Sequence, residues 1–365
     1  MKVFLLLNII LTVTIAQQLN SQYDEIWKLW KFKYNKTYSI NDEIKRKLIF
    51  MNYVTKIHQH NLRYDLGLES YTMGLNQFCD MNWNELKTIL FPHRFINNHP
   101  LLWNDNNEEL TLLSHISYIP LKWDWRDYGL VTPVKDQGMC GSCWAFSTTG
   151  SIEGQFAKIY KKSISLSEQQ LIDCSYLYGN HGCHGGTMDQ SFNYLKKYPI
   201  ESEFDYPYKG VKSSCHFHLS KGIIKIKKFI DLPTKNEKIL QKAVYHYGPI
   251  SVAIDASFDF VLYNWKLVCL LPQKAVADDL VHSYIKTIIC YLLHFRSGIY
   301  ESKYCSSSLL NHAVLVIGYG TEHNKDYWLI KNSWSDKWGM NGYIKLRRNK
   351  HNMCGIATNA SFPIL

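Results

Sequence analysis

The sequence lacks the features that mark membrane proteins and nucleic-acid-binding proteins. Beyond the first sixteen residues no apolar stretch reaches the length of a membrane-spanning helix, and the apolar segment 285–295 covers only 11 residues. No internal repeat is visible. The basic residues are spread along the chain, and the densest group, Lys225, Lys227 and Lys228, alternates with isoleucine as on the solvent face of a strand. We therefore expect no nucleic acid and no membrane among its partners, although the formal net charge is +10.

Signatures of a metal or redox centre are also scarce. Cys140-Gly141-Ser142-Cys143 forms a C-x-x-C motif, but no second such pair and no histidine pair stands at zinc-ligand spacing. The βαβ pattern that would precede a thioredoxin-like motif is not visible either. We therefore predict no metal and no cofactor. A disulfide between Cys140 and Cys143 would favour the redox alternative.

The features that are present begin with a secretion signal. Lys2 is followed by an apolar run from Val3 to Ile15, and small residues at Thr14 and Ala16 stand where signal peptidase cleaves. Residues 1–16 are therefore predicted to direct the chain into the secretory pathway, toward the lysosome or the outside of the cell. Secretion permits disulfides, and the chain has ten cysteines.

Changes in composition divide the rest of the chain. Residues 21–62 show helical spacing, whereas residues 92–118 are rich in Asn, His and Pro and are expected to form an extended linker. After Pro120 a Gly- and Cys-rich stretch leads into a helix that starts near Cys143. From about Ser251 onward, β-branched runs predict strands. The pattern indicates an α+β protein with two subdomains and a cleft between them.

The segment Gln137-Gly138-Met139-Cys140-Gly141-Ser142-Cys143-Trp144 has the chemistry of a nucleophile. Cys143 follows a Gly-Ser turn and precedes a helical pattern, so its sulfur would lie at the positive end of a helix dipole, which favours the thiolate. Acyl transfer also needs donors for a developing oxyanion, and the Cys143 backbone N–H and the Gln137 side-chain amide are candidates.

This segment resembles the active-site segment of the papain-like cysteine peptidase family. Asn311-His312-Ala313-Val314 resembles the histidine segment of that family, and Asn332-Ser333-Trp334 resembles its asparagine segment. The chain as a whole is similar to a cathepsin L-like precursor with an inhibitory prosegment. The resemblance implies a papain-like fold with a helical left half, an antiparallel β-barrel-like right half and a helical N-terminal prodomain.

The resemblance also implies the catalytic roles. His312 would form a thiolate–imidazolium pair with Cys143 and protonate the leaving amine. Asn332 would orient the imidazole ring, Trp334 would shield that contact from water, and Gln137 would bind the oxyanion. The implied activity is that of a cysteine endopeptidase made as a zymogen and activated by removal of its propeptide.

Other residues are implied to bind substrate or to form disulfides. Gly182-Cys183-His184-Gly185-Gly186 resembles the substrate wall of the family, where glycines let a peptide backbone approach closely. Asn359 replaces the small apolar residue that is typical of cathepsin L, so its pocket is expected to take polar or basic side chains as well. The implied substrate-binding residues are Gly185, Gly186, Met188, Ala253, Asn311, Trp334 and Asn359. The implied disulfides are Cys140–Cys183, Cys174–Cys215 and Cys305–Cys354, which leave Cys143 free.

The N-terminal part resembles the inhibitory prosegment of the same family. Its first motif consists of Asp42, Arg46, Ile49, Phe50, Tyr53, Ile57 and Asn61, and its second is Gly74-x-Asn76-x-Phe78-x-Asp80. The resemblance implies a propeptide at 17–118 with its core at 26–86, a peptidase domain at 119–365 and maturation between Leu112 and Pro120. The expected partners are peptide or protein substrates, its own propeptide as an intramolecular inhibitor, and cystatin-like inhibitors. The active form is expected to be a monomer.

An insert at 261–294 departs from the family pattern. His312 lies 169 residues after Cys143, whereas roughly 130–150 are expected. Three interpretations compete: a surface loop, a regulatory flap on the leaving-group side of the cleft, and a translated intron, which the apolar run and the unmatched Cys269 and Cys290 favour. An insert that disturbed the strand before His312 would leave a catalytically impaired homologue that binds peptides, and this is the alternative to an active enzyme.

Overall fold

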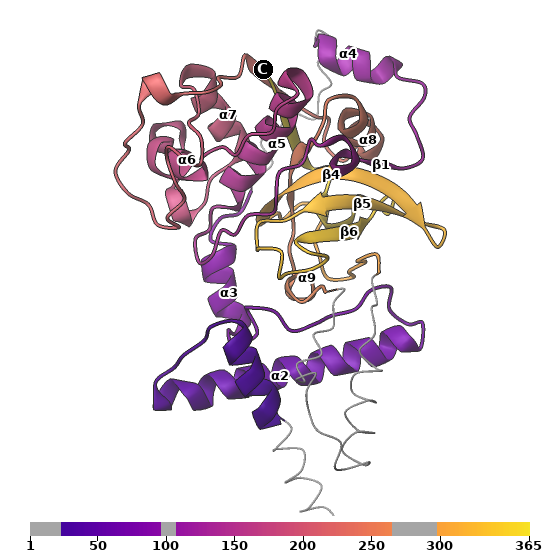
Figure 1. Cartoon of the computed structure of the whole chain (residues 1–365). Helices are drawn as coiled ribbons and strands as arrows, with labels where there is room; N and C mark the ends of the chain where they lie inside the picture. The colour runs from indigo at the N-terminus through magenta and orange to yellow at the C-terminus, as the bar shows by residue number, and fades with distance from the viewer. Residues whose placement is uncertain (1–22, 96–106, 265–297) are drawn as a thin grey trace, which may run out of the picture. The chain divides into compact units, whose positions relative to one another are not determined.

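The computed structural model describes residues 23–95, 107–264 and 298–365 (Figure 1). The chain separates into two compact units, which within the described residues are 23–82 and the remainder, and each is considered by itself. No helix in these ranges is both long enough and apolar enough to cross a membrane. The predicted signal at 1–16 lies outside the described residues.

The first unit contains two helical segments. Residues 23–33 are helical, and α2 then spans Ile40–Asp65. The side chain of Ser39 accepts a hydrogen bond from the Asp42 amide, which satisfies one of the free N–H groups at the start of α2. The helical pattern predicted across 21–62 is thus interrupted by a turn before Ser39.

The prosegment motifs form the core of this unit. Phe50 is fully buried between helices, with its ring centroid 5.1 Å from that of Trp30. The Trp30 indole donates to the Asn76 carbonyl at 2.9 Å, and the Tyr53 hydroxyl donates to the Met81 carbonyl at 2.6 Å. Trp30 of the first helical segment therefore holds the second motif, and Tyr53 of the first motif holds the residue that follows it.

Asp80, the last residue of the second motif, is an ion-pair centre within this unit. Its carboxylate lies 3.0 Å from Lys36 Nζ and accepts a 2.6 Å hydrogen bond from the Tyr38 hydroxyl. Arg46 of α2 donates to the Asp80 backbone carbonyl at 2.9 Å. Asp80 therefore stabilises the prosegment's own fold.

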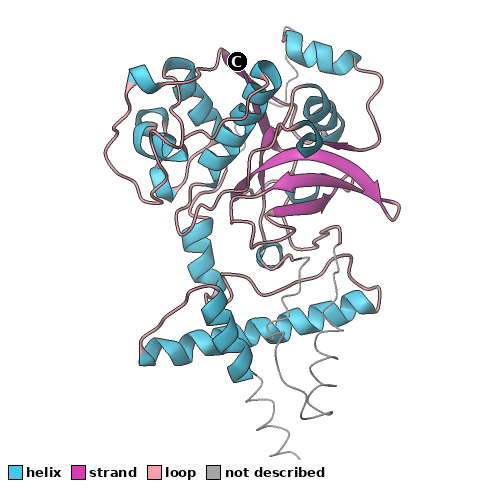
Figure 2. Cartoon of the chain, viewed as in Figure 1, coloured by secondary structure: helices cyan, strands magenta, loops and turns pink. Residues whose placement is uncertain are grey.

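The second unit contains the remaining helices and all the described strands (Figure 2). Its helices are α3 (Trp83–Leu90), α4 (Glu108–His115), α5 (Cys143–Tyr160), α6 (Glu168–Cys174), α7 (Met188–Lys197), α8 (Glu237–His246) and α9 (Phe258–Val261). Its strands are β1 (Trp123–Asp124), β2 (Lys228–Asp231), β3 (Ile250–Ile254), β4 (His312–Glu322), β5 (Lys325–Lys331), β6 (Tyr343–Arg347) and β7 (Asn359–Ile364).

The strands form one antiparallel sheet in the order β2-β7-β3-β4-β5-β6, with β1 paired to β4. In register, Ala253 of β3 faces Ala313 of β4 on one side and Asn359 of β7 on the other. Figure 1 shows α5, α6 and α7 gathered beside the sheet. Helix α5 packs against β3, β4 and β7, so its first turn reaches the start of β4. The two-subdomain α+β prediction is confirmed.

Disulfides fasten each half of this unit. Cys140–Cys183 and Cys174–Cys215 lie in the helical half, and Cys305–Cys354 lies in the strand half. These are the three pairs that the family resemblance implies. Of the remaining described cysteines, Cys79 and Cys143 are free and buried.

The linker predicted at 92–118 is only partly irregular. Residues 92–95 are extended, but Glu108–His115 form α4, so the prediction of an extended linker is wrong there. The Asn107 side chain accepts from the amides of Glu109 and Leu110 and thereby begins the helix. Eight residues are too few to show a clear helical period, which is why the sequence pattern did not reveal this element.

The predicted insert begins within the folded core rather than outside it. Val261, Leu262 and Tyr263 are fully buried, and the Trp338 indole donates to the Val261 carbonyl at 2.9 Å. The Tyr263 hydroxyl donates to the Gly298 carbonyl at 2.9 Å and thus joins the two flanks of the insert. Strand β4 forms completely from His312 onward. Cys269, Cys290 and the rest of the insert up to 294 lie outside the described residues.

Candidate active site

Cys143 is the first residue of α5, at the positive end of the helix dipole. The turn before it is tight, because the Gly141 amide donates to the Cys183 carbonyl at 3.0 Å and a Cβ at Gly141 would lie 2.6 Å from that oxygen. Cys140 is bonded to Cys183, so Cys143 is a free thiol. This pairing removes the C-x-x-C disulfide on which the redox alternative depends.

His312 lies beside this thiol at the first position of β4. The amide of the next residue, Ala313, donates to Cys143 Sγ with an N–S distance of 3.4 Å. His312 Nε2 is 2.9 Å from Asn332 Oδ1, and the imidazole stacks on Trp334 with centroids 4.6 Å apart and planes at 25°. Among the described residues, the other ring nitrogen, Nδ1, has no hydrogen-bond partner. Asn332 thus holds one nitrogen and leaves the other for the sulfur.

Gln137 is fully buried and lies next to the same group of residues. Its Oε1 accepts from the Ser333 hydroxyl at 2.6 Å, and its Nε2 donates to the Cys140 carbonyl at 2.9 Å. The Ser333 amide also donates to Asn332 Oδ1 at 2.8 Å. Because Ser333 fixes the Gln137 amide with its oxygen inward, both Nε2 hydrogens point away from Ser333. Sequence reasoning included Ser333 only as part of a motif and assigned it no role.

The covered thiol and imidazole are both neutral. Burial raises the pKa of the Cys143 thiol to about 11, although hydrogen bonds from backbone amides, Ala313 first among them, act in the opposite direction. Burial lowers the pKa of His312 to about 4, although its bond to Asn332 favours the charged ring. Between these two pH values, neither group carries a charge.

Residues 91–95 contribute to this burial. The family resemblance implies a linker that lies through the cleft, but sequence reasoning gave none of these residues a role. The Phe91 ring lies edge-on to His312, with centroids 5.6 Å apart. A Cβ on Gly141 would lie 2.4 Å from Pro92 Cγ, and a Cβ on Gly185 would lie 2.2 Å from His93 Cβ. Glycine at these two positions therefore lets the segment lie directly on the turn before Cys143 and on the predicted substrate wall. No periodicity or motif in residues 91–95 signalled this placement.

The segment ends in the predicted specificity pocket. Phe95 is 3% exposed and belongs to the same buried cluster as Met188 and Ala253. Its amide donates to the Leu310 carbonyl at 2.9 Å in an isolated antiparallel bridge. Asn359 is buried beside Ala253 in the sheet, and among the described residues its Oδ1 has no hydrogen-bond partner.

The other predicted substrate-binding residues differ in their surroundings. A Cβ on Gly186 would lie 2.8 Å from the Trp144 indole, so only glycine fits there. The Asn311 side chain accepts from the Ala256 amide at 2.7 Å and donates to Asp255 Oδ1 at 2.8 Å. It is thus bound to the loop after β3, and a direct contact with substrate stays a prediction.

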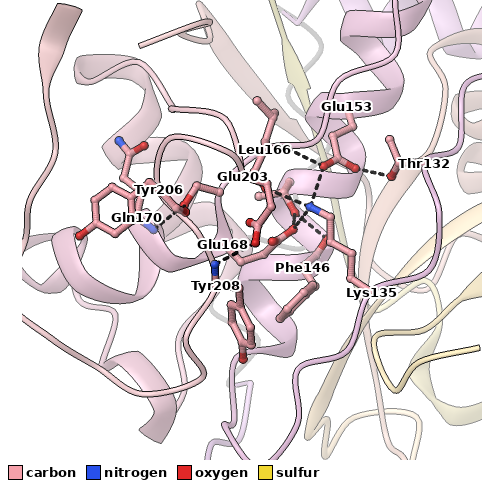
Figure 3. Close-up of polar contacts among 12 residues, drawn as sticks. Thr132, Lys135, Phe146, Glu153, Leu166, Glu168, Gln170, Glu203, Tyr206 and Tyr208 are labelled. Atoms are coloured by element: carbon pink, nitrogen blue, oxygen red, sulfur yellow. Dashed lines mark hydrogen bonds and ion pairs between the residues drawn. The ribbon is translucent and has the colours of Figure 1, made fainter. Parts of the chain in front are cut away.

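A second buried polar cluster lies further along α5 (Figure 3). Lys135 Nζ is 3.0 Å from Glu153 Oε1 and 2.7 Å from Glu168 Oε1, and Lys331 Nζ donates to Thr132 Oγ1 at 2.9 Å. Burial acts to raise the pKa of Glu153, but Lys135 and Lys331 outweigh it and the pKa is lowered. Burial raises the pKa of Glu168 to about 7 despite the opposing effect of Lys135. Sequence reasoning did not identify this cluster.

Two family models match the chain. The model described as "Papain family cysteine protease" matches residues 119–283 and 271–364, and the model described as "Cathepsin propeptide inhibitor domain (I29)" matches residues 27–86. Together they cover most of the chain outside the predicted signal and the linker.

Curated proteins and solved structures are similar along nearly the whole chain. A cathepsin L-like proteinase of Fasciola hepatica is 42% identical over 346 residues, 94% of each chain. Procathepsin L of Rattus norvegicus is 38% identical over 361 residues, 97% of this chain and 96% of the relative. The solved structure of a digestive procathepsin L2 proteinase from the larval midgut of Tenebrio molitor is 36% identical, with a TM-score of 0.80 over 94% of this chain and all of that one.

Proposed function

Because the chain belongs to the papain family of cysteine proteases, and is a cathepsin L-like cysteine endopeptidase with an inhibitory propeptide, we propose that Cys143 is its nucleophile and His312 its general acid and base. One observation carries this assignment. The Ala313 amide lies 3.4 Å from Cys143 Sγ while Asn332 holds the far nitrogen of the adjacent imidazole at 2.9 Å. A thiol, an imidazole and an orienting amide in this order are the parts that activated-nucleophile catalysis requires.

The reaction follows from these positions. The Cys143 sulfur attacks the peptide carbonyl carbon, and the electrons of the C=O double bond move to its oxygen. The Cys143 N–H and Gln137 Nε2 are the donors for this oxyanion. His312 then donates a proton to the departing amine as the C–N bond breaks. A water molecule, deprotonated by His312, attacks the thioester, and the acid product leaves as the sulfur is released.

The zymogen is inactive because its dyad is neutral and covered. Phe91 packs edge-on against His312 and keeps water from both reacting groups. When residues 91–95 leave, water reaches the thiol and the ring, and the penalty for charging them falls. Transfer of the thiol proton to His312 then gives the thiolate that attacks peptides.

The propeptide also escapes cleavage by its direction. A substrate would place the second residue before the cleaved bond in the proposed pocket of Met188 and Ala253, with its leaving side at His312. The propeptide instead has Phe91 at His312 and Phe95 at that pocket, so the chain runs the opposite way. A reversed peptide does not present its carbonyl carbon and leaving amine in the order that the thiol and the imidazole require.

Pocket chemistry favours a mixed preference. Phe95 belongs to the same buried cluster as Met188 and Ala253 in the zymogen, which supports a pocket that takes apolar side chains. At its edge the buried Asn359 oxygen, unpartnered among the described residues, is able to accept a hydrogen bond from a substrate. We infer that the mature enzyme accepts glutamine or basic side chains there as well as apolar ones.

Maturation and location complete the proposal. We place the signal at 1–16, the propeptide at 17–118 and the peptidase domain at 119–365, with passage through the secretory pathway to the lysosome or the outside of the cell. Loss of the ion pair between Asp80 and Lys36 would loosen the prosegment core. Cystatin-like inhibitors and peptide substrates remain the proposed partners of the monomeric enzyme.

A thiol-directed affinity reagent tests the assignment. The acid-matured wild-type protein should be labelled at Cys143 and lose activity in proportion. The Cys143→Ser protein should take no label and should hydrolyse peptides at least about a thousandfold more slowly. A folded, matured protein that is not labelled at Cys143 would instead support the binding-protein alternative.

A further inference from the structure

The last propeptide helix, α4, lies outside the region matched by the propeptide inhibitor model, which ends at residue 86. The N-terminus of α4 is capped, because Asn107 Oδ1 accepts hydrogen bonds from the amides of Glu109 at 3.1 Å and Leu110 at 3.2 Å. The negative side chains of Glu108 and Glu109 in its first turn interact favourably with the positive end of the helix dipole. An eight-residue helix is nevertheless marginal by itself in water, so α4 depends on what it docks against.

Helix α4 docks on α8 within the same unit (Figure 1). Leu113 is fully buried and Leu110 is 5% exposed, whereas Leu112 on the outer face is 46% exposed. The Lys242 amine of α8 donates to the Ser114 carbonyl at 3.1 Å, at the C-terminal end of α4 where carbonyls lack helical partners. The helix is therefore held by its apolar face and by its last turn.

The N-terminal turn of α4 has its own partners. Glu109 Oε1 lies 2.6 Å from Lys228 Nζ of the edge strand β2. Burial, and next the negative charge of Glu109, raise the pKa of Tyr247 to about 12, which places that carboxylate near the residue after α8. The surface formed by α8 and β2 thus offers a lysine to each end of α4, whose first turn is acidic and whose Leu110 and Leu113 are buried.

We propose that the α8–β2 face is a second docking surface of the propeptide, that its ligand is the acidic amphipathic helix α4, and that docking protects residues 108–115 from proteolysis so that the first maturation cut falls at 116–120. Residues 116–120 have no helix or strand hydrogen bonding, and Tyr118 is 77% exposed. An endopeptidase binds its substrate extended. It therefore reaches 116–120 directly, but reaches 108–115 only after α4 undocks and unfolds.

Limited proteolysis of the inactive Cys143→Ser zymogen tests this inference. The inference rests on the proposed maturation, but an unrelated low-specificity serine protease makes the cuts, so the outcome does not depend on Cys143 being the nucleophile. Mass spectrometry of the products gives the rate and position of each cut. In the parent protein the first cut should fall at 116–120.

Matched leucine variants distinguish protection by docking from an effect of the amino-acid sequence on cleavage. Leu113→Ala removes a fully buried side chain and should speed cutting within 108–115 by about tenfold or more. Leu112→Ala, on the exposed face of the same helix, should change that rate by less than about twofold. Leu112→Gly leaves the docked face intact but weakens the helix, and should speed cutting by roughly fivefold.

The docking surface is tested from its own side. Lys242→Met removes the donor to Ser114 and should speed cutting by a few-fold, whereas Lys238→Met, an exposed lysine on the same helix, should not. The thermal unfolding midpoint should be the same in all variants, because α4 lies on the outside of the unit. If Leu113→Ala and Leu112→Gly both leave rate and sites unchanged, or if the parent is cut within 108–115 as fast as within 116–120, the proposal is wrong.

Discussion

Helix α5 carries two buried polar clusters that are buried in different ways. At its first residue, Cys143 accepts from the amide next to His312, and Phe91, which we propose that maturation removes, covers the His312 ring. Ten residues later, Glu153 meets Lys135 inside the permanent fold of the peptidase domain. Among the described residues, the first cluster has no opposite charge next to either group, and the second is built from opposite charges.

The two clusters consequently differ in charge. Burial without a counter-ion moves the pKa of Cys143 to about 11 and that of His312 to about 4, so both are neutral. In the other cluster, burial acts to lower the pKa of Lys135, but Glu153 and Glu168 outweigh it and the pKa is raised. Burial under a segment that we propose is removed thus leaves Cys143 and His312 uncharged in the zymogen. Burial in the permanent fold instead requires charges that are paired, as in the Lys135 cluster.

The largest effect is expected from unpairing the permanent cluster. Lys135→Met leaves two carboxyls, Glu153 and Glu168, facing each other inside the protein. The free energy of unfolding should fall by about 3–5 kcal/mol, as when one partner of a buried pair is removed. Urea denaturation of the Cys143→Ser zymogen measures it, with the exposed Lys162→Met as control. A loss below about 1 kcal/mol would contradict the inference that the permanent cluster depends on its paired charges.

The next largest effect is expected from removing the Phe91 side chain that covers His312. Phe91→Ala in the zymogen should let water reach Cys143 and His312, so that the thiol pKa falls from about 11 and the imidazole pKa rises from about 4. Alkylation of Cys143 by iodoacetamide at pH 6 should become at least about tenfold faster, since one pKa unit changes the thiolate fraction tenfold. Phe204→Ala, at a phenylalanine 92% exposed, is the control. Equal alkylation rates would mean that Phe91 does not control the dyad.

Local sequence signals predicted the elements that carry Cys143 and His312, whereas the roles proposed for these residues also depended on the family resemblance. The Gly-Ser turn before Cys143 and the apolar helix after it predicted the start of α5, and β-branched residues after His312 predicted β4. Each signal lies within a few residues of the group that it positions. The three disulfides came from the family resemblance, because cysteine counting alone leaves the pairing open.

Elements that depend on distant contacts could not be predicted. Phe91 covers His312 from 221 residues away, and α4 exists because Leu113 docks on α8. Neither contact leaves a periodic pattern, since short helices depend on tertiary packing. Val261 was assigned to the insert because the family pattern breaks after Phe260, yet its carbonyl accepts a hydrogen bond from Trp338 in the core. The charged cluster gave one local hint: Glu153 stands among small and apolar residues in α5.

A smaller effect is expected from the pH response of the permanent cluster. Glu168 has a pKa near 7 in the folded chain, above its unfolded value, so the folded protein binds more protons between about pH 4.5 and 7. Stability contributed by this group is present at acidic pH and is lost as pH rises through 7. Glu168→Gln removes that loss of stability. The free energy of unfolding of the variant, relative to that of wild type, should therefore rise by roughly 1–3 kcal/mol between pH 4.5 and pH 7.5, measured by urea denaturation. A difference that does not change with pH would mean that Glu168 does not hold this proton.

The smallest effect concerns the buried amide of Asn359. Asn359 is paired with Ala253, which shares a buried cluster with Phe95, and the Asn359 Oδ1 lacks a partner among the described residues. A substrate that replaces Phe95 with glutamine would donate to that oxygen, a hydrogen bond worth about 1 kcal/mol. Asn359→Ala should therefore lower the kcat/KM for glutamine relative to leucine at this position by roughly fivefold, with Asn349→Ala unchanged. If both variants keep the wild-type ratio in a matched pair of peptide substrates, the Asn359 oxygen has no part in recognition, and its burial is structural like that of Glu153.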